Sequence, residues 1–518
     1  MRKHDGSCTR REFLARSAAG ASLVIVPGFL SGCVKKGTVT GPVEPASVGA
    51  GYFGQFGIDE ALMKKVIDRA MSGGGNYADL FFQHRIENWV VLEDGQVNRA
   101  YTSVGLGCGV RVLSGDQTGF AFTEELTAES LLAAAGTAAA VASGPAAPPM
   151  ESVHRISPEV YYTADVPFSE VGLDRKIPLL ERLNERAFGH DERIVKVRAN
   201  MNDSTTRVLV FSSEGEMVED DQPMAMVSCA CVAEDGVRRE ENWYSLSRRA
   251  GFEFYDEAMM DELADQAATR TMVLFEASPP PPGECPVVLA PGLSGILLHE
   301  AIGHGMEADF NRKGISVYAD RIGERIAPKS VTIVDDGTNP AERGSLNIDD
   351  EGRETRRTVL VEAGILRSYM HDRISAGHYG VAPTASGRRE SYRYPPVPRM
   401  RNTYMLDGPH DPGEIISSVK KGIYAETFTN GQVKIGSGDF SFYLKNGRLI
   451  EDGKLTTPVK DANLIGFGPE VLEKVQMVGN DMAMYSGAGY CGKDGQRVPV
   501  GFGLPTTKCG GISVGGVK

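Results

Sequence analysis

A run of four prolines at 279–282, in the stretch "EASPPPPGECP" (Glu276–Pro286), divides this chain more sharply than any other feature. Proline fixes φ and has no backbone N–H, so consecutive prolines cannot continue a helix and add little to a sheet. The 518 residues are enough for two domains that each bury a hydrophobic core. We therefore expect an α+β chain, with an N-terminal α/β domain over 53–277 and a β-rich C-terminal domain over 284–518.

The two halves show different local patterns. Apolar residues at helical spacing, ended by glycine or proline signals, alternate with strand-like runs in the first half. The expected helices are Ile58–Met71, Ala128 to about Ala142, Leu173–Phe188 and about Asp256 to Leu274. In the second half, Asn430-Gly431 and Asn446-Gly447 predict two-residue turns between hairpin strands.

The first 33 residues have a pattern typical of protein export. The segment Thr9–Cys33 begins with the basic pair Arg10-Arg11, continues with a modest apolar stretch and ends in Leu30-Ser31-Gly32-Cys33. The basic pair predicts a twin-arginine signal, and the end resembles a bacterial lipobox, in which Cys33 is lipidated. The segment 34–52, rich in Gly, Pro, Ser and Thr, predicts a flexible tether. We expect a lipoprotein on the periplasmic side; the alternative is a cytosolic protein with a chance Arg-Arg pair.

The charge of the chain limits its partners. Its net charge is −13 and its pI is near 5.3, which argues against nucleic acids and anionic membrane surfaces as partners. No segment after the signal has 18 apolar residues in a row, so we expect no membrane-spanning helix. Contact with a membrane is expected through the N-terminal lipid only.

The stretch "LLHEAIGHGMEADF" (Leu297–Phe310) in the C-terminal domain resembles a zinc-protease helix with one extra residue. Its histidines, His299 and His304, are five apart, and residues five apart on a regular helix point about 140° away from each other. Both can face one ion only if the helix contains a π turn or breaks before His304. Gly303 and Gly305 permit either irregularity, so the motif predicts a metal-binding helix with a local distortion.

Two histidines require a third protein ligand if one position is to stay open for catalysis. The residues leave three candidates: Glu307, Asp309 and Cys491, the last in the glycine-rich "GAGYCGKDGQRVPVG". Glu300, directly after His299, has the position of a general base toward a metal-bound water. Two nitrogens and one thiolate favour Zn²⁺, and Fe²⁺ or Co²⁺ remain open.

Three long segments carry a family resemblance. They are "LLHEAIGHGMEADFNRKGISVY", "SGRRESYRYPPVPRMRNTYM" (Ser386–Met405) and "CGKDGQRVPVGFG" (Cys491–Gly503). In this order they resemble the TldD/PmbA family of metalloproteases, and within it the TldD-like catalytic branch. The similarity extends over nearly the whole chain after the export signal and is densest after Pro286.

The resemblance implies a set of roles. His299, His304 and Cys491 are expected to bind the metal, and Glu300 is expected to be the catalytic acid and base. It also implies peptide hydrolysis by a two-domain subunit that forms either a homodimer or a heterodimer with a TldE/PmbA-like subunit lacking the metal motif. Most family members are cytoplasmic and trim unfolded peptides and leader segments, so the predicted export puts these substrates in question.

Further polar residues are weaker candidates. Arg388, Arg389, Tyr392, Arg401 and Asn402, together with Arg399, are suited to binding a peptide backbone or its carboxylate, and Tyr392 is also suited to stabilising an oxyanion. Packing of a proline-rich loop or of a dimer surface explains them equally well. For His371, His378 and the neighbouring Cys229 and Cys231, packing or surface roles are expected rather than metal binding.

The sequence thus predicts a zinc-dependent metallopeptidase that cleaves extended or unfolded peptides. We expect the peptide to lie as an added strand along a sheet edge. Two alternatives remain open from the residues: an exported binding or assembly lipoprotein with a structural metal site, and a metal-dependent hydrolase of a non-peptide amide.

Overall fold

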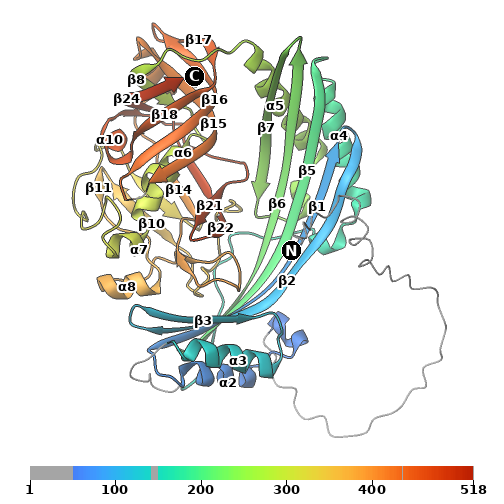
Figure 1. Cartoon of the computed structure of the whole chain (residues 1–518), viewed down its shortest axis with the longest axis vertical. Helices are drawn as coiled ribbons and strands as arrows, with labels where there is room; N and C mark the ends of the chain where they lie inside the picture. Colours follow the sequence, from blue (N-terminus) through green and yellow to red (C-terminus); the bar gives the residue numbers. More distant parts are fainter. Residues whose placement is uncertain (1–50, 142–149, 435, 517–518) are drawn as a thin grey trace, which may run out of the picture. The chain divides into compact units, whose positions relative to one another are not determined.

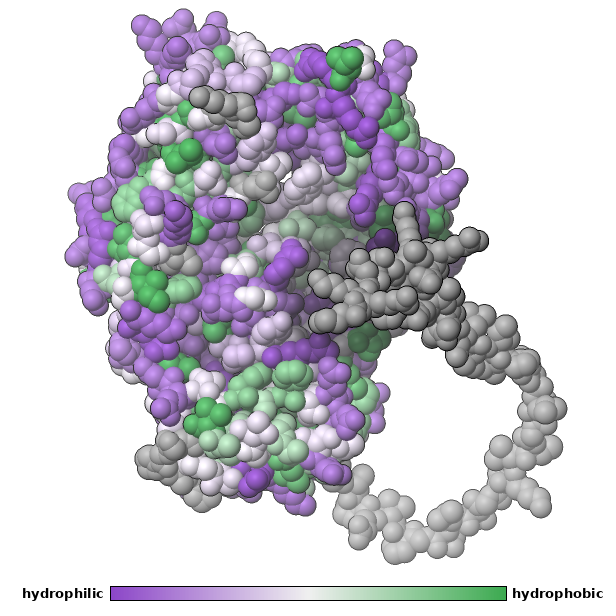
Figure 2. Space-filling view, viewed as in Figure 1, coloured by the Kyte–Doolittle hydropathy of each residue, from purple (hydrophilic) through white to green (hydrophobic). Residues whose placement is uncertain are grey.

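The computed structural model describes residues 51–141, 150–434 and 436–516 (Figure 1). The predicted export signal, Cys33 and all but the last two residues of the predicted tether lie outside these described residues. No helix of the described part is long and apolar enough to cross a membrane. Hydrophilic residues cover much of the face seen in Figure 2, and apolar residues gather in a patch near its bottom.

One sheet of long strands organises the first half of the chain (Figure 1). Its strands pair antiparallel in the order β3-β2-β1-β5-β6, with β7 also paired to β6 and the short β4 parallel to β6. The bounds are β1 (Tyr77–Glu93), β2 (Gln96–Ser114), β3 (Gln117–Thr123), β4 (His154–Ile156), β5 (Ile194–Ser212), β6 (Glu216–Asp235) and β7 (Arg238–Arg248).

Two pairs of helices bury different stretches of this sheet. The pair α2 (Glu60–Met71) and α3 (Ala128–Ala139) shares a core with the strand residues Phe82 and Val110. The pair α4 (Leu173–Phe188) and α5 (Glu257–Met272) shares a second core with Val197 and Val227. All four predicted helices are confirmed, and three begin at a side-chain cap, because Asp59, Thr127 and Asp256 each accept a backbone N–H of the first turn.

The second half is dominated by strands. In its larger sheet, the pairings β15–β8, β8–β24, β24–β18, β18–β16 and β16–β15 form a closed ring. A second sheet has the order β11-β10-β9-β14-β23-β20. One apolar core connects both sheets and includes Phe428, Phe442 and Met400. The strands of the ring are β8 (Gly283–Leu289), β15 (Lys421–Lys434), β16 (Asp439–Glu451), β18 (Ala462–Phe467) and β24 (Thr507–Gly516).

The remaining elements are short. The second sheet contains β9 (Ile333–Asp336), β10 (Arg357–Glu362), β11 (Ile365–Leu366), β14 (Asn402–Met405), β20 (Ala483–Met484) and β23 (Gly501–Leu504). Outside it are β12 (Gly387–Arg388), β13 (Val397–Pro398), β17 (Lys454–Val459), β19 (Val475–Val478), β21 (Tyr490–Lys493), β22 (Gln496–Pro499), α8 (Arg373–Tyr379), α9 (Pro412–Ser417) and α10 (Gly468–Glu473). The expected α+β class, with a β-rich second half, is confirmed.

The two predicted Asn-Gly turns are wrong. Both pairs lie inside strands: Asn430-Gly431 in β15 and Asn446-Gly447 in β16. The glycines serve close packing instead, since a Cβ on Gly431 would lie 2.4 Å from the Phe442 ring and a Cβ on Gly447 would lie 2.7 Å from the Tyr424 carbonyl oxygen. The turn after β16 uses Asp452-Gly453, whose φ values of 46° and 77° fit a type I′ turn.

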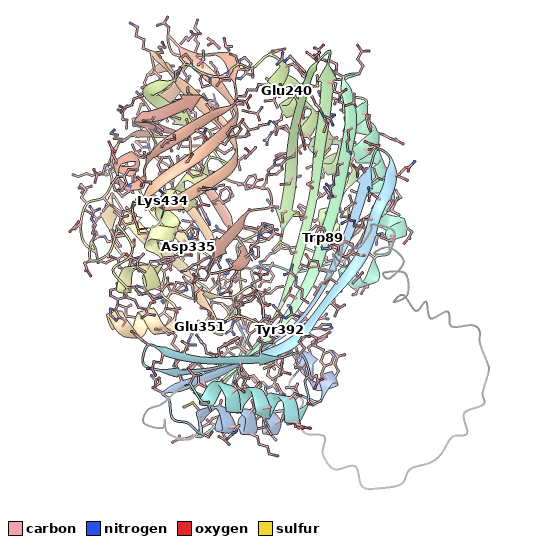
Figure 3. All side chains as sticks on the ribbon, in the orientation of Figure 1. Trp89, Glu240, Asp335, Glu351, Tyr392 and Lys434 are labelled. Carbon is pink, nitrogen blue, oxygen red and sulfur yellow. The ribbon has the colours of Figure 1, made fainter. Side chains whose placement is uncertain are left out.

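Buried ion pairs connect the first sheet to the second half of the chain. Arg111 of β2 donates to Asp79 of β1 at 2.7 Å through Nε and to Glu351 at 2.7 Å through Nη1. All three side chains are excluded from solvent. Glu351 and Tyr392 lie next to β3 in Figure 3, where residues far apart in the sequence meet.

Candidate metal centre

The motif helix contains the predicted irregularity. After α6 (Gly295–Leu298), the segment His299–Gly303 is a π-helix, followed by a 3₁₀ turn (His304–Met306) and α7 (Ala308–Arg312). The His304 N–H donates to the His299 carbonyl, which closes the five-residue π turn. A Cβ on Gly303 would lie 2.1 Å from the Met400 sulfur, so the neighbouring side chain requires glycine here. Of the two predicted irregularities, a π turn or a break before His304, the structure has the π turn.

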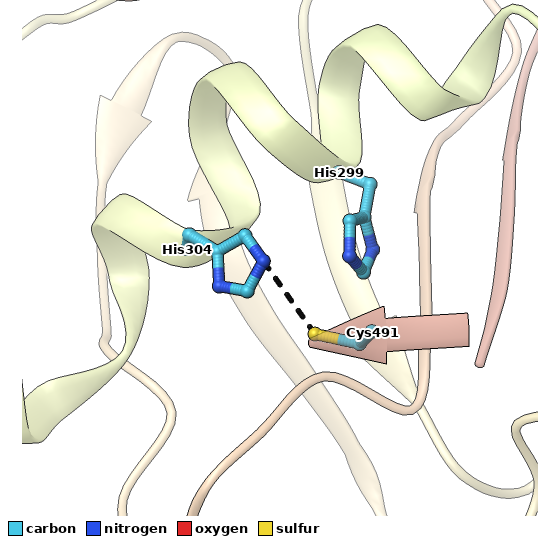
Figure 4. A group of neighbouring side chains, drawn as sticks. All are labelled: His299, His304 and Cys491. Atoms are coloured by element: carbon cyan, nitrogen blue, oxygen red, sulfur yellow. Dashed lines mark hydrogen bonds between the residues drawn. The ribbon is translucent and has the colours of Figure 1, made fainter. Parts of the chain in front are cut away.

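The π turn brings both histidines to one side of the helix, facing Cys491 of β21 (Figure 4). One ligand atom from each of the three residues lies within 4.8 Å of the others, and the Cys491 sulfur is 3.5 Å from His304 Nε2. All three side chains are buried. The strand β21 pairs with β22 through a tight turn at Asp494-Gly495, with φ values of 50° and 73°, which holds the thiol in place.

The cluster has the donors that a soft divalent ion requires. Both ring nitrogens of His299 are buried and have no hydrogen-bond partner among the described residues, although buried polar groups are normally paired. Burial raises the pKa of the Cys491 thiol, but the two imidazoles outweigh this effect and hold that pKa well below its ordinary value. A thiolate and two imidazoles fit Zn²⁺.

Glu307 lies behind His304 instead of beside the thiol. Its carboxylate is fully buried and lies 3.0 Å from His304 Nδ1. Burial raises the pKa of Glu307, but Lys493, His304 and Arg399 together outweigh this effect and lower the pKa to about 2. An ionised carboxylate only accepts hydrogen bonds, so His304 Nδ1 carries a proton, and Nε2, which faces the Cys491 sulfur, is the nitrogen placed to bind a metal.

Lys493 and Arg399 connect the motif helix to the strand that carries Cys491. Lys493 Nζ lies 3.2 Å from Glu307 and 2.7 Å from Asp309, both next to the motif helix, while its own strand carries Cys491. Arg399 donates to the Cys491 carbonyl oxygen and lies 3.9 Å from Glu307. Asp309 is thus paired with Lys493. Lys493 was not among the residues predicted from the sequence, although its two-residue spacing from Cys491 places both side chains on one face of a strand.

Glu300 lies at the edge of the cluster. Its side chain is 18% exposed, in contrast to the buried ligand candidates, and its Oε2 is 3.9 Å from His304 Nε2. This carboxylate is therefore both close to the candidate ligands and in contact with solvent, which a residue that exchanges protons with a substrate requires.

The other predicted residues lie deeper in the fold. Arg401 Nε donates to Asp335 at 2.8 Å, and Asn402 donates to the Asp336 carbonyl at 2.8 Å, so both hold β14 against β9. Tyr392 is buried against Phe122. The structure does not bring these three residues into the histidine–cysteine cluster, and a role for them in substrate binding stays a prediction.

His371, His378 and the cysteine pair stay outside the cluster. His371 is buried between Tyr369 and Tyr379, and burial together with Arg356 lowers its pKa to about 4. Cys229 and Cys231 are buried in β6, with their sulfurs 3.9 Å apart. None of these residues belongs to the metal-compatible group found among the described residues.

Three family models match the chain in order: PmbA/TldA metallopeptidase domain 1 over residues 78–142, the central domain over 166–275 and the C-terminal domain over 282–516. A metalloprotease TldD homolog of Haemophilus influenzae is 41% identical over 452 residues, which cover 86% of this chain and 93% of the relative. The chain belongs to the PmbA/TldD metallopeptidase family. The family membership and the name of this relative support a peptidase activity.

Two further relatives of this PmbA/TldD family member are informative. A protein of Saccharolobus solfataricus named zinc metalloprotease TldD homolog is 29% identical over 468 residues, covering 88% of this chain and all of the relative. The solved structure of TldE from Thermococcus kodakarensis superimposes with a TM-score of 0.71 at 17% identity, over 88% of this chain and all of that chain. The second likeness concerns the fold alone.

Replacing Glu307 with glutamine is expected to weaken zinc binding by roughly ten- to a hundred-fold, the usual effect of losing a carboxylate behind a ligating histidine. The amide cannot stabilise the His304 Nδ1–H as an ionised carboxylate does, and Lys493 loses one of its two carboxylate partners and keeps Asp309. Competition with a chromophoric chelator measures the change. Glu324→Gln is the matched control, because Glu324 forms an exposed pair with Arg321. An unchanged affinity in Glu307→Gln would remove Glu307 from the site.

Proposed function

We propose that this chain is a zinc-dependent peptidase in which His299, His304 and Cys491 bind the metal and Glu300 is the acid and base. The observation that carries the proposal is the cluster itself: three donor atoms within 4.8 Å, with both nitrogens of His299 unpaired. The zinc in the name of the Saccharolobus solfataricus relative supports the choice of metal.

When bound, zinc would supply a Lewis acid that polarises a carbonyl group and lowers the pKa of a water. Glu307 holds a proton of His304 on Nδ1, so Nε2 is the nitrogen that would bind the metal. Glu300 accepts a proton from the attacking water, whose oxygen bonds to the scissile carbonyl carbon. Glu300 then passes this proton to the amide nitrogen, the C–N bond breaks, and the amine leaves.

Extended or unfolded peptides are the proposed substrates, and a chelation experiment tests this. Purified protein is treated with a chelator and then supplied with zinc, and hydrolysis of an unfolded peptide is followed by mass spectrometry. We expect hydrolysis to stop with the chelator and to return with zinc. Cleavage of small non-peptide amides alone would favour the amide-hydrolase alternative, and zinc binding without any hydrolysis would favour the binding lipoprotein.

We also propose that the mature chain is a periplasmic lipoprotein anchored through Cys33. The support is the order of Arg10-Arg11, an apolar stretch and a lipobox-like end before Cys33. In cells fed a labelled fatty acid, Cys33→Ala is expected to lose the label and to release the protein from the membrane fraction. Labelling that persists in Cys33→Ala would contradict the anchor.

A partner subunit is a further part of the proposal. The fold is shared with TldE of Thermococcus kodakarensis, which supports a pairing of this chain with a TldE/PmbA-like subunit that lacks the metal motif. The molar mass of the purified chain, alone and after co-expression with such a subunit, distinguishes a homodimer from a heterodimer; a monomer under both conditions would contradict either one.

A further inference from the structure

A small cavity next to the Cys491 hairpin is lined by positive charge. Its lining includes six arginines but only two carboxylates, those of Asp350 and Glu390. Its volume is about 80 Å³, and one water takes up roughly 30 Å³ in the liquid, so a carboxylate group fits. The arginines are Arg85, Arg249, Arg343, Arg388, Arg389 and Arg497.

Several of these guanidinium groups have N–H donors without an acceptor. The Nε atoms of Arg85, Arg249, Arg388 and Arg389 are buried without a hydrogen-bond partner in the described part of the chain, as is Nη1 of Arg389. Arg249, Arg388 and Arg389 are only 3%, 2% and 4% exposed. A buried unpaired polar group costs about 1–3 kcal/mol, and a charged one costs more. Unpaired donors around one cavity therefore indicate an anionic acceptor.

Aromatic rings lie against some of the guanidinium groups of the lining. Arg249 lies over Tyr162 at 5.0 Å, Arg343 over Tyr490 at 4.5 Å and Arg389 over Phe81 at 4.3 Å, measured to the ring centroids. Stacking of this kind fixes the plane of a guanidinium, whose N–H groups lie in that plane and remain able to donate.

The two carboxylates of the lining do not satisfy these donors. Glu390 accepts from the backbone N–H of Arg497 at 2.6 Å. Asp350 accepts from the backbone N–H of Arg389 at 2.7 Å, while the Arg389 guanidinium reaches the Asp350 carbonyl oxygen at 2.8 Å and Asp79 at 3.4 Å. Arg388 donates through Nη1 to the Met400 carbonyl oxygen at 2.6 Å. The cavity therefore keeps free donors after its internal contacts are counted.

The cavity is adjacent to the candidate metal centre. Tyr490 and Val498 belong to its lining; Tyr490 precedes Cys491 in β21, and Val498 is the cross-strand partner of Cys491.

We propose that this cavity binds a carboxylate of the peptide substrate. The inference rests on the proposed peptidase function and adds a substrate class to it: peptides with a carboxylate near the bond that is cut. Arginine is suited to this task because its fork of N–H donors matches the two oxygens of a carboxylate. The carboxylate belongs either to the C-terminus of the peptide or to an Asp or Glu side chain.

Binding to zinc-free protein tests the inference without turnover. Isothermal titration calorimetry compares acetyl-Ala-Ala-Ala-Ala as the free acid with its C-terminal amide, and acetyl-Ala-Ala-Glu-Ala amide with the Gln-containing amide. We expect at least one carboxylate form to bind about tenfold or more tightly than its neutral match, equal to about 1.4 kcal/mol. The first pair reports the C-terminus and the second pair reports the side chain. Equal affinities within both pairs would overturn the proposal.

Arginine variants assign the preference to the cavity. Arg249→Gln and Arg388→Gln are expected to reduce the ratio of affinities toward one, and Arg497→Gln, at an exposed position that disturbs folding less, is expected to reduce it in part. Arg182→Gln is the matched control, since Arg182 forms surface pairs with Glu257 and Asp261. A preference that survives in all three cavity variants would overturn the proposal. Peptide hydrolysis by the unmodified protein is measured separately with zinc. A carboxylate preference in this protein without any hydrolysis would refute the peptidase function alone.

Discussion

Glu300→Gln is expected to lower peptide hydrolysis by at least about a hundred-fold, the usual contribution of a general acid–base residue, while zinc content stays unchanged. Glutamine has nearly the same shape but cannot accept a proton from water or return it to the amine. Glu300 lies 3.9 Å from His304 Nε2 and is partly exposed, whereas the ligand candidates are buried. The substitution should therefore remove the chemistry without removing the metal.

The hydrolysis rate is measured with one peptide substrate, on protein whose zinc content per chain has been determined. Glu470→Gln is the control, because Glu470 forms an exposed pair with Lys474 and its change should leave the rate as it was. Turnover at the wild-type rate in Glu300→Gln would exclude Glu300 as the acid and base. A loss of zinc together with activity would instead make Glu300 a ligand.

Cys491→Ser is expected to reduce zinc affinity by more than a hundred-fold and to abolish turnover at ordinary zinc concentrations. A serine hydroxyl stays protonated near neutral pH and is a poor zinc ligand, whereas the two imidazoles hold the pKa of the Cys491 thiol well below its ordinary value despite burial. The remaining imidazoles of His299 and His304 form an incomplete site.

Equilibrium dialysis against buffered zinc measures the affinity of Cys491→Ser. Cys285→Ser serves as the control, because Cys285 is a free, partly buried cysteine of β8 outside the cluster. Wild-type affinity in Cys491→Ser would mean that the third ligand is another residue. Glu307 is paired with His304 and Lys493, and Asp309 with Lys493, so such a result would require both pairs to rearrange.

The local sequence predicted the distortion of the motif helix because this distortion is a matter of helical spacing. A separation of five between His299 and His304 requires a π turn or a break, and the structure has the π turn. Gly303 permits it and also makes room for Met400, a contact that no local pattern reveals. The start of α5 was predictable for a similar reason, since Asp256 caps the first turn.

The position of Cys491 opposite the motif was not predictable from spacing, because 187 residues separate it from His304. The residues alone left Glu307, Asp309 and Cys491 open, and only the family resemblance favoured the cysteine. The prediction of the Asn-Gly turns was wrong because a dipeptide pattern does not distinguish a turn from a strand. In a strand, glycine can make room for a neighbouring ring, as Gly431 does beside Phe442. Arg388 and Arg389 were noticed, but their shared cavity depends on Arg85 and Arg249 from the first sheet region.

X-ray absorption at the zinc edge of the purified, zinc-loaded protein tests the proposed centre most directly. The account predicts one sulfur ligand at about 2.3 Å and imidazole nitrogens at about 2.0–2.1 Å, with the sulfur contribution missing from any zinc that remains in Cys491→Ser. A first shell of nitrogen and oxygen only in the wild-type protein, or a protein that retains no zinc at all, would contradict it.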